Sequence, residues 1–148
     1  MQTFLPQISF KESAECLDNR RLGKQRVEAM QIMKALLLPE YGWKNHPAVK
    51  MWKGNEFALL IYQRAICEEW SKRGFKDTCW LKTLDIFSTY ISMDGATMPD
   101  ELLHLPSWYF DEDLRLSHRS NLVRKDASYY SKQWPDVKDN LPYIWPKP

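Results

Sequence analysis

The chain has 148 residues, of which 44% are hydrophobic, and this length suits one domain with a buried core. Its 21 Lys and Arg against 19 Asp and Glu give a net charge of +2, so the protein as a whole is not a polycation. Any anion site must therefore come from a local cluster of basic residues. The three cysteines, Cys16, Cys67 and Cys79, fit neither a zinc site nor a disulfide framework, and we expect no metal and no cofactor.

The first ten residues, MQTFLPQISF, lack the basic start and the long apolar run of a signal peptide. No stretch approaches the length of about 18 apolar residues that a membrane span requires. Together with the widely spaced cysteines, these features predict a cytoplasmic protein with no membrane partner. The chain has no repeat, low-complexity run or flexible linker, so we expect residues 1–148 to form a single domain.

Helical signals dominate the first half of the chain. The first predicted helix begins at about Asp18, a good N-cap, and ends at Leu38 before Pro39. The second opens in NHPAVKMW, where Pro47 fits the first helical turn, and continues for about 27 residues to Gly74.

The third predicted helix starts near Thr78 and ends in MDGATMP, and a shorter helix covers Asp113 to Lys125. The tail QWPDVKDNLPYIWPKP contains four of the nine prolines and should lie extended against the surface. No alternating run predicts a strand. We therefore expect an all-α, compact single domain with three main helices, a short C-terminal helix and an extended aromatic and Pro-rich tail.

The stretch RRLGKQR in the first helix contains four basic side chains and no acid. On a helical wheel, Arg20, Arg21 and Lys24 lie on the polar side together with Glu28. These side chains are either an ordinary solvated face or a surface that holds phosphate.

Arg26 does not join them, because it falls in the middle of the apolar stripe between Leu22 and Met33. A buried guanidinium without a partner costs several kcal/mol, so Arg26 must meet an anion. One alternative is an internal ion pair with a carboxylate such as Asp77 or Asp85, or a side chain that extends to solvent. The other is an Arg fork held at the floor of a pocket for a phosphate or a base edge.

A second acid-free basic stretch, RLSHRSNLVRK, lies near the C-terminus. Its candidate phosphate ligands are Arg115, His118, Arg119 and Lys125, and Arg115 and Arg119 are one helical turn apart. His46 precedes Pro47 and is a candidate anion ligand at a helix N-terminus, or else a cap or a buried hydrogen-bonding residue.

Aromatic residues outside the strongest helical stripes are candidates for stacking on a nucleotide base. We assign this role to Trp43, Trp108 and Tyr109. The alternative is that they belong to the core, where most aromatic side chains of a domain this size lie.

Four stretches, in chain order, resemble the pyrimidine-dimer DNA glycosylases of the phage endonuclease V type. They are the RRLGKQR helix, NHPAVKMW, WSKRGFKDT, and SWY followed by SHRSNLVRKD. KRGFKDT is the most specific of them, and the resemblance covers most of the chain. It looks closest to a divergent branch of the family that carries the RRLGKQR helix.

The resemblance implies a mostly helical domain that kinks DNA, flips a nucleotide and cuts the glycosidic bond. In the family the α-amine of the mature N-terminus attacks the sugar C1′ and forms a Schiff base, and a Glu of the basic helix assists. An α-amine has a pKa of about 7.7–8.0, so a useful fraction is neutral near pH 7. Arg21 and Arg26 correspond to the phosphate-holding arginines, and His46 and Lys125 also match.

The N-terminus departs from the family pattern. The family exposes its attacking residue by removing Met1 from a small second residue, whereas Gln2 is bulky and should hinder that removal. The nucleophile would then be the α-amine of Met1 itself, with Thr3 internal, and Lys24 is the alternative nucleophile.

The position of the catalytic acid also departs from the family pattern. The part of the helix where a catalytic Glu is expected reads Leu-Gly-Lys-Gln, and the nearest acids, Asp18 and Glu28, are each at least a turn away. Three functions therefore stay open: a DNA glycosylase with or without strand-nicking lyase activity, an inactive pocket that binds a nucleotide or a cyclic-nucleotide signalling molecule, and an architectural DNA-binding module. The partner is DNA in the first and third cases and a nucleotide ligand in the second.

Overall fold

The computed structural model describes residues 1–94 and 105–147, and within these residues it contains helices and no strand. The all-α prediction is confirmed. The α-helices are α1 (Phe10–Cys16), α2 (Asn19–Leu37), α3 (Pro47–Trp52), α4 (Glu56–Lys72), α5 (Trp80–Asp94), α6 (Glu112–Lys125) and α7 (Ala127–Gln133), and a 3-10 turn covers Ser107–Phe110.

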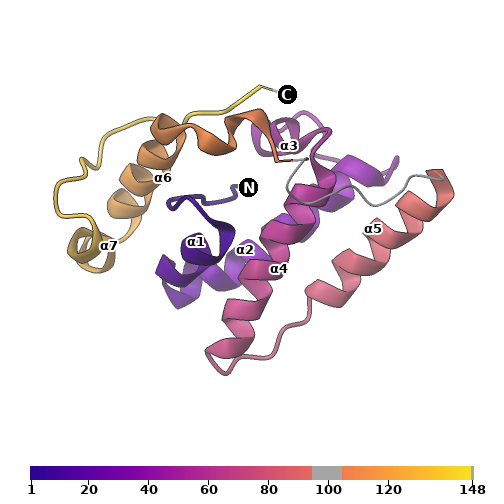
Figure 1. Cartoon of the computed structure of the whole chain (residues 1–148), viewed down its shortest axis with the longest axis horizontal. Helices are drawn as coiled ribbons and strands as arrows, with labels where there is room; N and C mark the ends of the chain where they lie inside the picture. Colours follow the sequence, from indigo (N-terminus) through magenta and orange to yellow (C-terminus); the bar gives the residue numbers. More distant parts are fainter. Residues whose placement is uncertain (95–104, 148) are drawn as a thin grey trace.

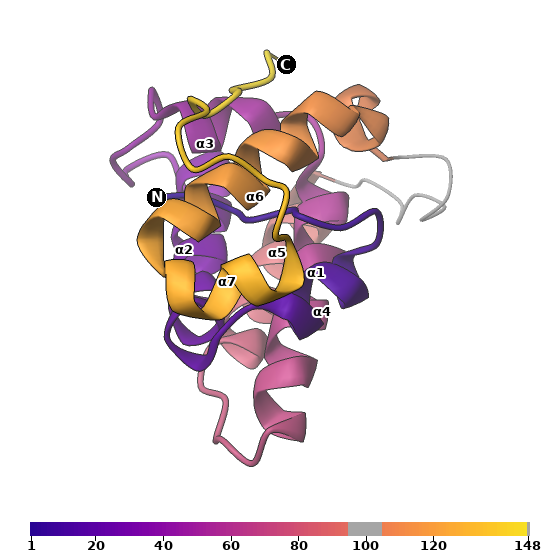
Figure 2. The ribbon, with the colours of Figure 1, turned by 90° about the vertical axis from the view of Figure 1, so that its left-hand side faces the viewer.

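The helices form a central group with one flank on each side (Figure 1). Helices α2 and α4 pass through the middle, α5 lies on one flank, and α6 and α7 lie on the other. The N-terminal segment runs between α6 and the central helices, and the C-terminal tail crosses over α6 (Figures 1 and 2). The first residues and the described end of the tail therefore both lie near α3 and α6 (Figures 1 and 2).

Helix α2 begins and ends close to the predicted bounds of Asp18 and Leu38. It packs closely against α4 at Gly23, where a Cβ atom would lie 2.9 Å from the ring of Trp70. Gly23 therefore allows the Trp70 ring to approach the backbone of α2.

The predicted continuous helix from Pro47 to Gly74 is wrong. The structure divides it into α3 and α4, with a turn at residues 53–55. Gly54 has a φ of +83° there, a left-handed conformation that breaks the run of helical hydrogen bonds. Gly74, at the predicted end, also has a positive φ and follows α4.

The C-terminal part matches the prediction more closely. Helix α6 covers Glu112–Lys125, against the predicted Asp113–Lys125, and the tail after α7 has no helix through residue 147. The short helices α1 and α7 were not predicted. The expected end of the third helix in MDGATMP lies partly outside the described residues. None of the described helices combines the length and apolar character needed to span a bilayer.

The N-terminal segment is buried and held by side chains of four helices, α2, α3, α4 and α6. The backbone N–H of Phe4 donates to Oε1 of Gln25 in α2 at 3.0 Å, and that of Leu5 donates to Nδ1 of His118 in α6 at 2.9 Å. The hydroxyl of Tyr62 in α4 donates to the carbonyl oxygen of Phe4 at 2.9 Å. The indole N–H of Trp52 donates to the hydroxyl of Thr3 at 2.9 Å. These bonds fix the position of the first residues of the chain.

Candidate active site

A pocket of about 350 Å³ lies beside the N-terminus. Its walls come from four parts of the chain: the N-terminal segment, one face of α2, the end of α6 and the C-terminal tail. The lining residues are Met1, Gln2 and Phe4; Arg20, Arg21, Lys24, Gln25 and Glu28; Lys125; and Tyr143 and Trp145. The pocket therefore joins the predicted nucleophiles Met1 and Lys24 to three of the predicted phosphate ligands.

A carboxylate lies at the inner wall of this pocket. Glu28 is only 8% exposed, and its Oε2 accepts a hydrogen bond from the backbone N–H of Gln2 at 3.1 Å. Gln2 follows Met1 directly, so the carboxylate lies one residue from the chain's first amine. Lys24 Nζ lies 3.6 Å from the other oxygen, Oε1, at the outer side of the pocket.

Gln25 holds the Glu28 carboxylate in place. Its Nε2 donates to Glu28 Oε2 at 3.1 Å, while its Oε1 accepts from Phe4 N–H at 3.0 Å and shares the single proton of the Tyr62 hydroxyl, 2.7 Å away, with the carbonyl oxygen of Phe4. The two donors fix which end of the amide is oxygen, and so which end faces Glu28. Gln25 is 1% exposed, so this orientation is protected from water.

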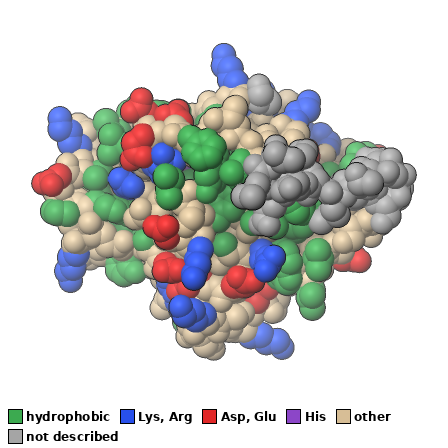
Figure 3. Space-filling view, viewed as in Figure 1, with side chains coloured by type: hydrophobic (Ala, Val, Ile, Leu, Met, Phe, Trp, Pro, Cys, Tyr) green, Lys and Arg blue, Asp and Glu red, His purple; other side chains and the backbone are tan. Residues whose placement is uncertain are grey.

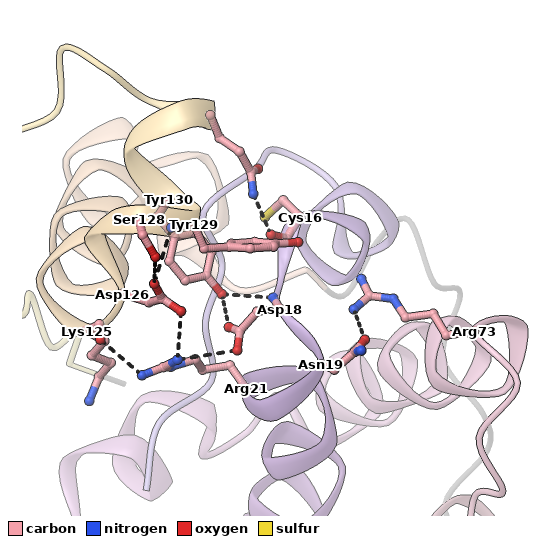
Figure 4. A network of polar contacts seen from close by, with 11 residues as sticks. Cys16, Asp18, Asn19, Arg21, Arg73, Lys125, Asp126, Ser128, Tyr129 and Tyr130 are labelled. Atoms are coloured by element: carbon pink, nitrogen blue, oxygen red, sulfur yellow. Dashed lines mark hydrogen bonds and ion pairs between the residues drawn. The ribbon is translucent and has the colours of Figure 1, made fainter.

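Arg21 is anchored by a polar network at the junction of α2, α6 and α7 (Figure 4). Its Nη1 lies 3.3 Å from Asp18 and 3.8 Å from Asp126, and its Nη2 donates to the carbonyl oxygen of Lys125 at 3.4 Å. Asp18 also accepts a short hydrogen bond from the Tyr130 hydroxyl. These partners hold the guanidinium at the pocket wall with contacts that are long for charged groups.

Positive charge gathers at the pocket rim. Burial lowers the pKa of Lys125, and the nearby charges of Arg21 and Lys24 lower it further. A bound anion would relieve this repulsion. Charges are distributed differently on the face shown in Figure 3. Basic and acidic side chains are interspersed there, and the described residues on that face form no broad basic patch.

His46 lies next to the pocket, in contact with the lining residue Trp145. Its ring meets those of Trp145 and Trp43 edge to face, with ring centres 6.1 and 6.2 Å apart. Burial lowers the pKa of His46, and the positive charge of the N-terminus lowers it further. Nδ1 of His46 accepts from Ala48 N–H at 3.0 Å, so this histidine caps α3.

Arg26 lies away from the pocket, in the internal ion pair that was one of its two predicted alternatives. Its Nη1 is 2.8 Å from Asp77, and its guanidinium lies 4.4 Å above the ring of Trp70. Burial by itself raises the pKa of Asp77. The hydrogen bonds from Arg26 and from the backbone of Trp80 and Cys79 outweigh it and lower that pKa.

Three other predicted phosphate ligands have internal partners. Arg115 is 5% exposed, pairs with Glu112 at 2.8 Å and donates to the carbonyl oxygen of Tyr109. His118 is fully buried, and burial lowers its pKa to about 3. Arg119 donates to the carbonyl oxygen of Pro6 at 2.7 Å. His118 and Arg119 hold α6 to the N-terminal segment, Arg115 holds the start of α6 to the turn before it, and none of the three lines the pocket.

The predicted stacking residues also lie outside the pocket wall. Trp108 is in the core, where its indole N–H donates to the carbonyl oxygen of Met51 at 3.0 Å, and Tyr109 packs edge to face on Phe10. Trp43 is 66% exposed beside His46.

Sequence reasoning missed six residues of the pocket, which are Gln2, Phe4, Gln25, Glu28, Tyr143 and Trp145. The wheel placed Glu28 on the same side as Arg21 and Lys24, and this was the available signal. Nothing local to the tail sequence shows that Tyr143 and Trp145 would return to α2. Within the described residues, no group of three His, Cys, Asp or Glu side chains is arranged to hold a metal ion.

The family model for pyrimidine dimer DNA glycosylase matches residues 1–83, more than half of the chain. The chain belongs to this family. The matched part contains the N-terminal segment, α2 and His46, whereas Lys125, Tyr143 and Trp145 come from beyond it. No curated protein and no solved structure gives a significant match. Membership of this DNA glycosylase family implies DNA as the substrate.

Proposed function

We propose that the protein is a DNA glycosylase with abasic-site lyase activity, in which the α-amine of Met1 attacks the sugar and Glu28 moves the protons. One observation carries this proposal: the buried Glu28 carboxylate accepts a hydrogen bond from Gln2 N–H at 3.1 Å, directly beside the first residue. An amine nucleophile and a carboxylate at the inner wall of one pocket are the two groups that Schiff-base chemistry needs.

The reaction balances with these two groups and solvent water. The neutral amine forms a bond to C1′ of the deoxyribose, the bond from C1′ to the base breaks, and the electron pair leaves with the base, which takes up a proton from water. The Glu28 carboxylate accepts a proton from the amine and returns it to the ring oxygen as the sugar opens, which gives the Schiff base. Removal of a 2′ proton then expels the 3′ phosphate and nicks the strand.

The rim of the pocket suits the DNA backbone. Arg20, Arg21, Lys24 and Lys125 surround it, and phosphate contacts of this type position a protein on DNA without reading sequence. The chemistry at C1′ requires that the target nucleotide leave the base stack and enter the pocket. Tyr143 and Trp145 give the wall an aromatic surface against which an extruded base can stack.

Borohydride trapping on abasic duplex DNA tests the proposal. Borohydride reduces a Schiff base to a stable amine, so we expect a covalent adduct, and peptide mapping should locate it at Met1. Intact mass first establishes that the purified chain starts at Met1. Lys24→Met should form the same adduct, because Lys24 Nζ lies on the outer side of Glu28.

Two outcomes would overturn the proposal. An adduct on Lys24, lost in Lys24→Met, would assign the nucleophile to that side chain. No adduct and no cleavage, together with tight binding of a free nucleotide, would favour the nucleotide-binding pocket.

A further inference from the structure

One side chain at the inner wall of the pocket has an unused hydrogen-bond donor. Gln2 is 7% exposed and lines the pocket, and its Oε1 accepts from Thr3 N–H at 2.8 Å. Its Nε2 has no hydrogen-bond partner among residues 1–94 and 105–147. A buried donor without a partner costs about 1–3 kcal/mol, so its position at a pocket calls for a ligand that completes it.

The orientation of this amide is fixed. Rotating the side-chain amide by half a turn would direct its NH2 group at Thr3 N–H, donor against donor. The neighbouring polar groups are already used, because Gln25 bonds Phe4, Tyr62 and Glu28. Gln2 Nε2 is therefore the buried side-chain donor among the lining residues that has no partner within residues 1–94 and 105–147.

Three other buried side chains of the described residues have an atom without a partner. They are Arg26, Gln63 and His118, and none of them lines this pocket. The comparison separates Gln2 from them: its unused donor belongs to a residue that borders the cavity and lies next to the proposed nucleophile.

Resting on the proposed function, we infer that Gln2 Nε2 donates a hydrogen bond to the O2 carbonyl of a pyrimidine base held in the pocket. O2 is attached to the carbon beside the glycosidic nitrogen, so it is the base acceptor nearest to C1′. Negative charge builds on this part of the base as the bond to C1′ breaks. A donor at O2 therefore binds the transition state more strongly than the ground state.

This role separates two steps that the Met1 amine performs. Base excision has a departing pyrimidine, whereas Schiff-base formation on a pre-formed abasic site has none. Removing the donor should slow the first step and leave the second unchanged. A side chain that only packs the N-terminal segment would change both steps or neither.

The test uses Gln2→Met, which keeps the length and bulk of the side chain without its amide. Intact mass checks that the first Met is still present. Base release from a duplex with a cyclobutane pyrimidine dimer is compared, in single turnover, with borohydride trapping on an abasic duplex. We expect excision to fall about 100-fold, the effect of losing one donor to a developing negative charge, with trapping within about 2-fold of wild type.

The ratio of the two rates, measured on one preparation, is independent of the fraction of folded protein. Gln63→Met, which removes a buried amide remote from the pocket, is the matched control and should leave the ratio unchanged. An unchanged ratio in Gln2→Met would overturn the inference. If the ratio is unchanged because both rates fall equally, Gln2 instead positions the amine.

Failures of the two proposals are distinguishable. If wild type traps abasic DNA at Met1 but does not release pyrimidine, the proposed nucleophile stands and the base contact is overturned. If wild type does neither, both proposals fail.

Discussion

Two arginines of the same helix, Arg21 and Arg26, have opposite surroundings. Arg26 pairs with Asp77 at 2.8 Å, with its guanidinium stacked on the ring of Trp70, on the side of α2 that faces away from the pocket. Arg21 lines the pocket, and its carboxylate partners lie at 3.3 and 3.8 Å. Both are paired, so pairing alone does not separate a structural arginine from a ligand-binding one.

The difference lies in how completely the carboxylate partners neutralise the charge of each arginine. The close pair of Arg26 sits beside an aromatic face, with side-chain exposures of 12% for Arg26 and 13% for Asp77. The longer contacts of Arg21 lie next to Lys24 and Lys125, whose charges its own charge repels. On one side of α2 the charge of Arg26 is therefore neutralised by Asp77. On the pocket side the basic residues carry excess positive charge that a bound anion would neutralise.

The largest effect should come from the acid on the pocket side. Glu28→Gln keeps the shape of the side chain but removes its ability to take up and return a proton, so borohydride trapping should slow about 10³-fold. Single-turnover trapping on abasic DNA measures this rate. Glu68→Gln is the matched control, because Glu68 is exposed on α4 and pairs with Arg64. Trapping within about 3-fold of wild type in Glu28→Gln would limit Glu28 to holding the N-terminal segment.

A substitution on the Arg26 side of α2 should lower folding stability without slowing the reaction. Arg26→Ala leaves the Asp77 carboxylate without its closest partner, and we expect a loss of about 2–3 kcal/mol, reduced from a fully buried pair by the remaining exposure. Denaturant unfolding measures this loss. Trapping per folded molecule should equal that of wild type, and a variant that folds normally but cannot trap would move Arg26 to the site.

The same pair has a pH signature. The pKa of Asp77 is lowered in the folded protein, so its stabilisation is present above the unfolded value of about 3.9 and is lost as pH falls through the folded value. The stability advantage of wild type over Asp77→Asn should therefore be constant near neutral pH and shrink below about pH 4. A constant difference down to pH 3 would contradict the pairing.

The fold was predictable where the signals are local. Asp18 and Pro39 bracket α2, as the preference of Asp for the N-cap position and the missing proline N–H predict, although the Asp18 side chain bonds Arg21 and Tyr130 and makes no capping hydrogen bond. The break between α3 and α4 was missed although Gly54 was visible, because a glycine inside a helical pattern signals a break only when its φ becomes positive.

The site was predictable only in part, because a helical wheel describes one helix alone. It placed Arg26 in the apolar stripe, and Asp77 and Asp85 were both possible partners. The choice between them, or of a ligand instead, depended on how the segment after α4 folds back. It grouped Glu28 with solvated residues, since it contains no information on the N-terminal segment that covers this face. Tyr143 reaches the pocket through a tail held on α6, where Ser120 accepts from the backbone N–H of Leu141 at 3.0 Å.

A smaller effect is expected on DNA affinity when a basic residue of the pocket is compared with a basic residue elsewhere on the surface. Arg21→Ala removes one phosphate ligand, so the Kd for an uncleavable abasic duplex should rise about 10-fold and the salt slope should fall by about 1. Fluorescence anisotropy at several salt concentrations measures both. Arg64→Ala removes the same charge from an exposed site on α4 and should change neither. Equal losses in the two variants would show that only net charge matters.

The smallest effect concerns a group beside the pocket whose role is structural. His46 Nδ1 caps the first turn of α3, so His46→Ala should cost about 1 kcal/mol at pH 7.5, while His46→Asn keeps a capping oxygen and should cost less. The pKa of His46 is lowered in the folded state, so the cap is fully present above the unfolded value of about 6.5 and is lost as pH falls. The difference between wild type and His46→Ala in thermal unfolding should therefore shrink as pH falls below about 6.5. A difference that does not shrink would mean that His46 stabilises through its contacts with Trp43 and Trp145, and the pocket side would then owe part of its rigidity to aromatic packing.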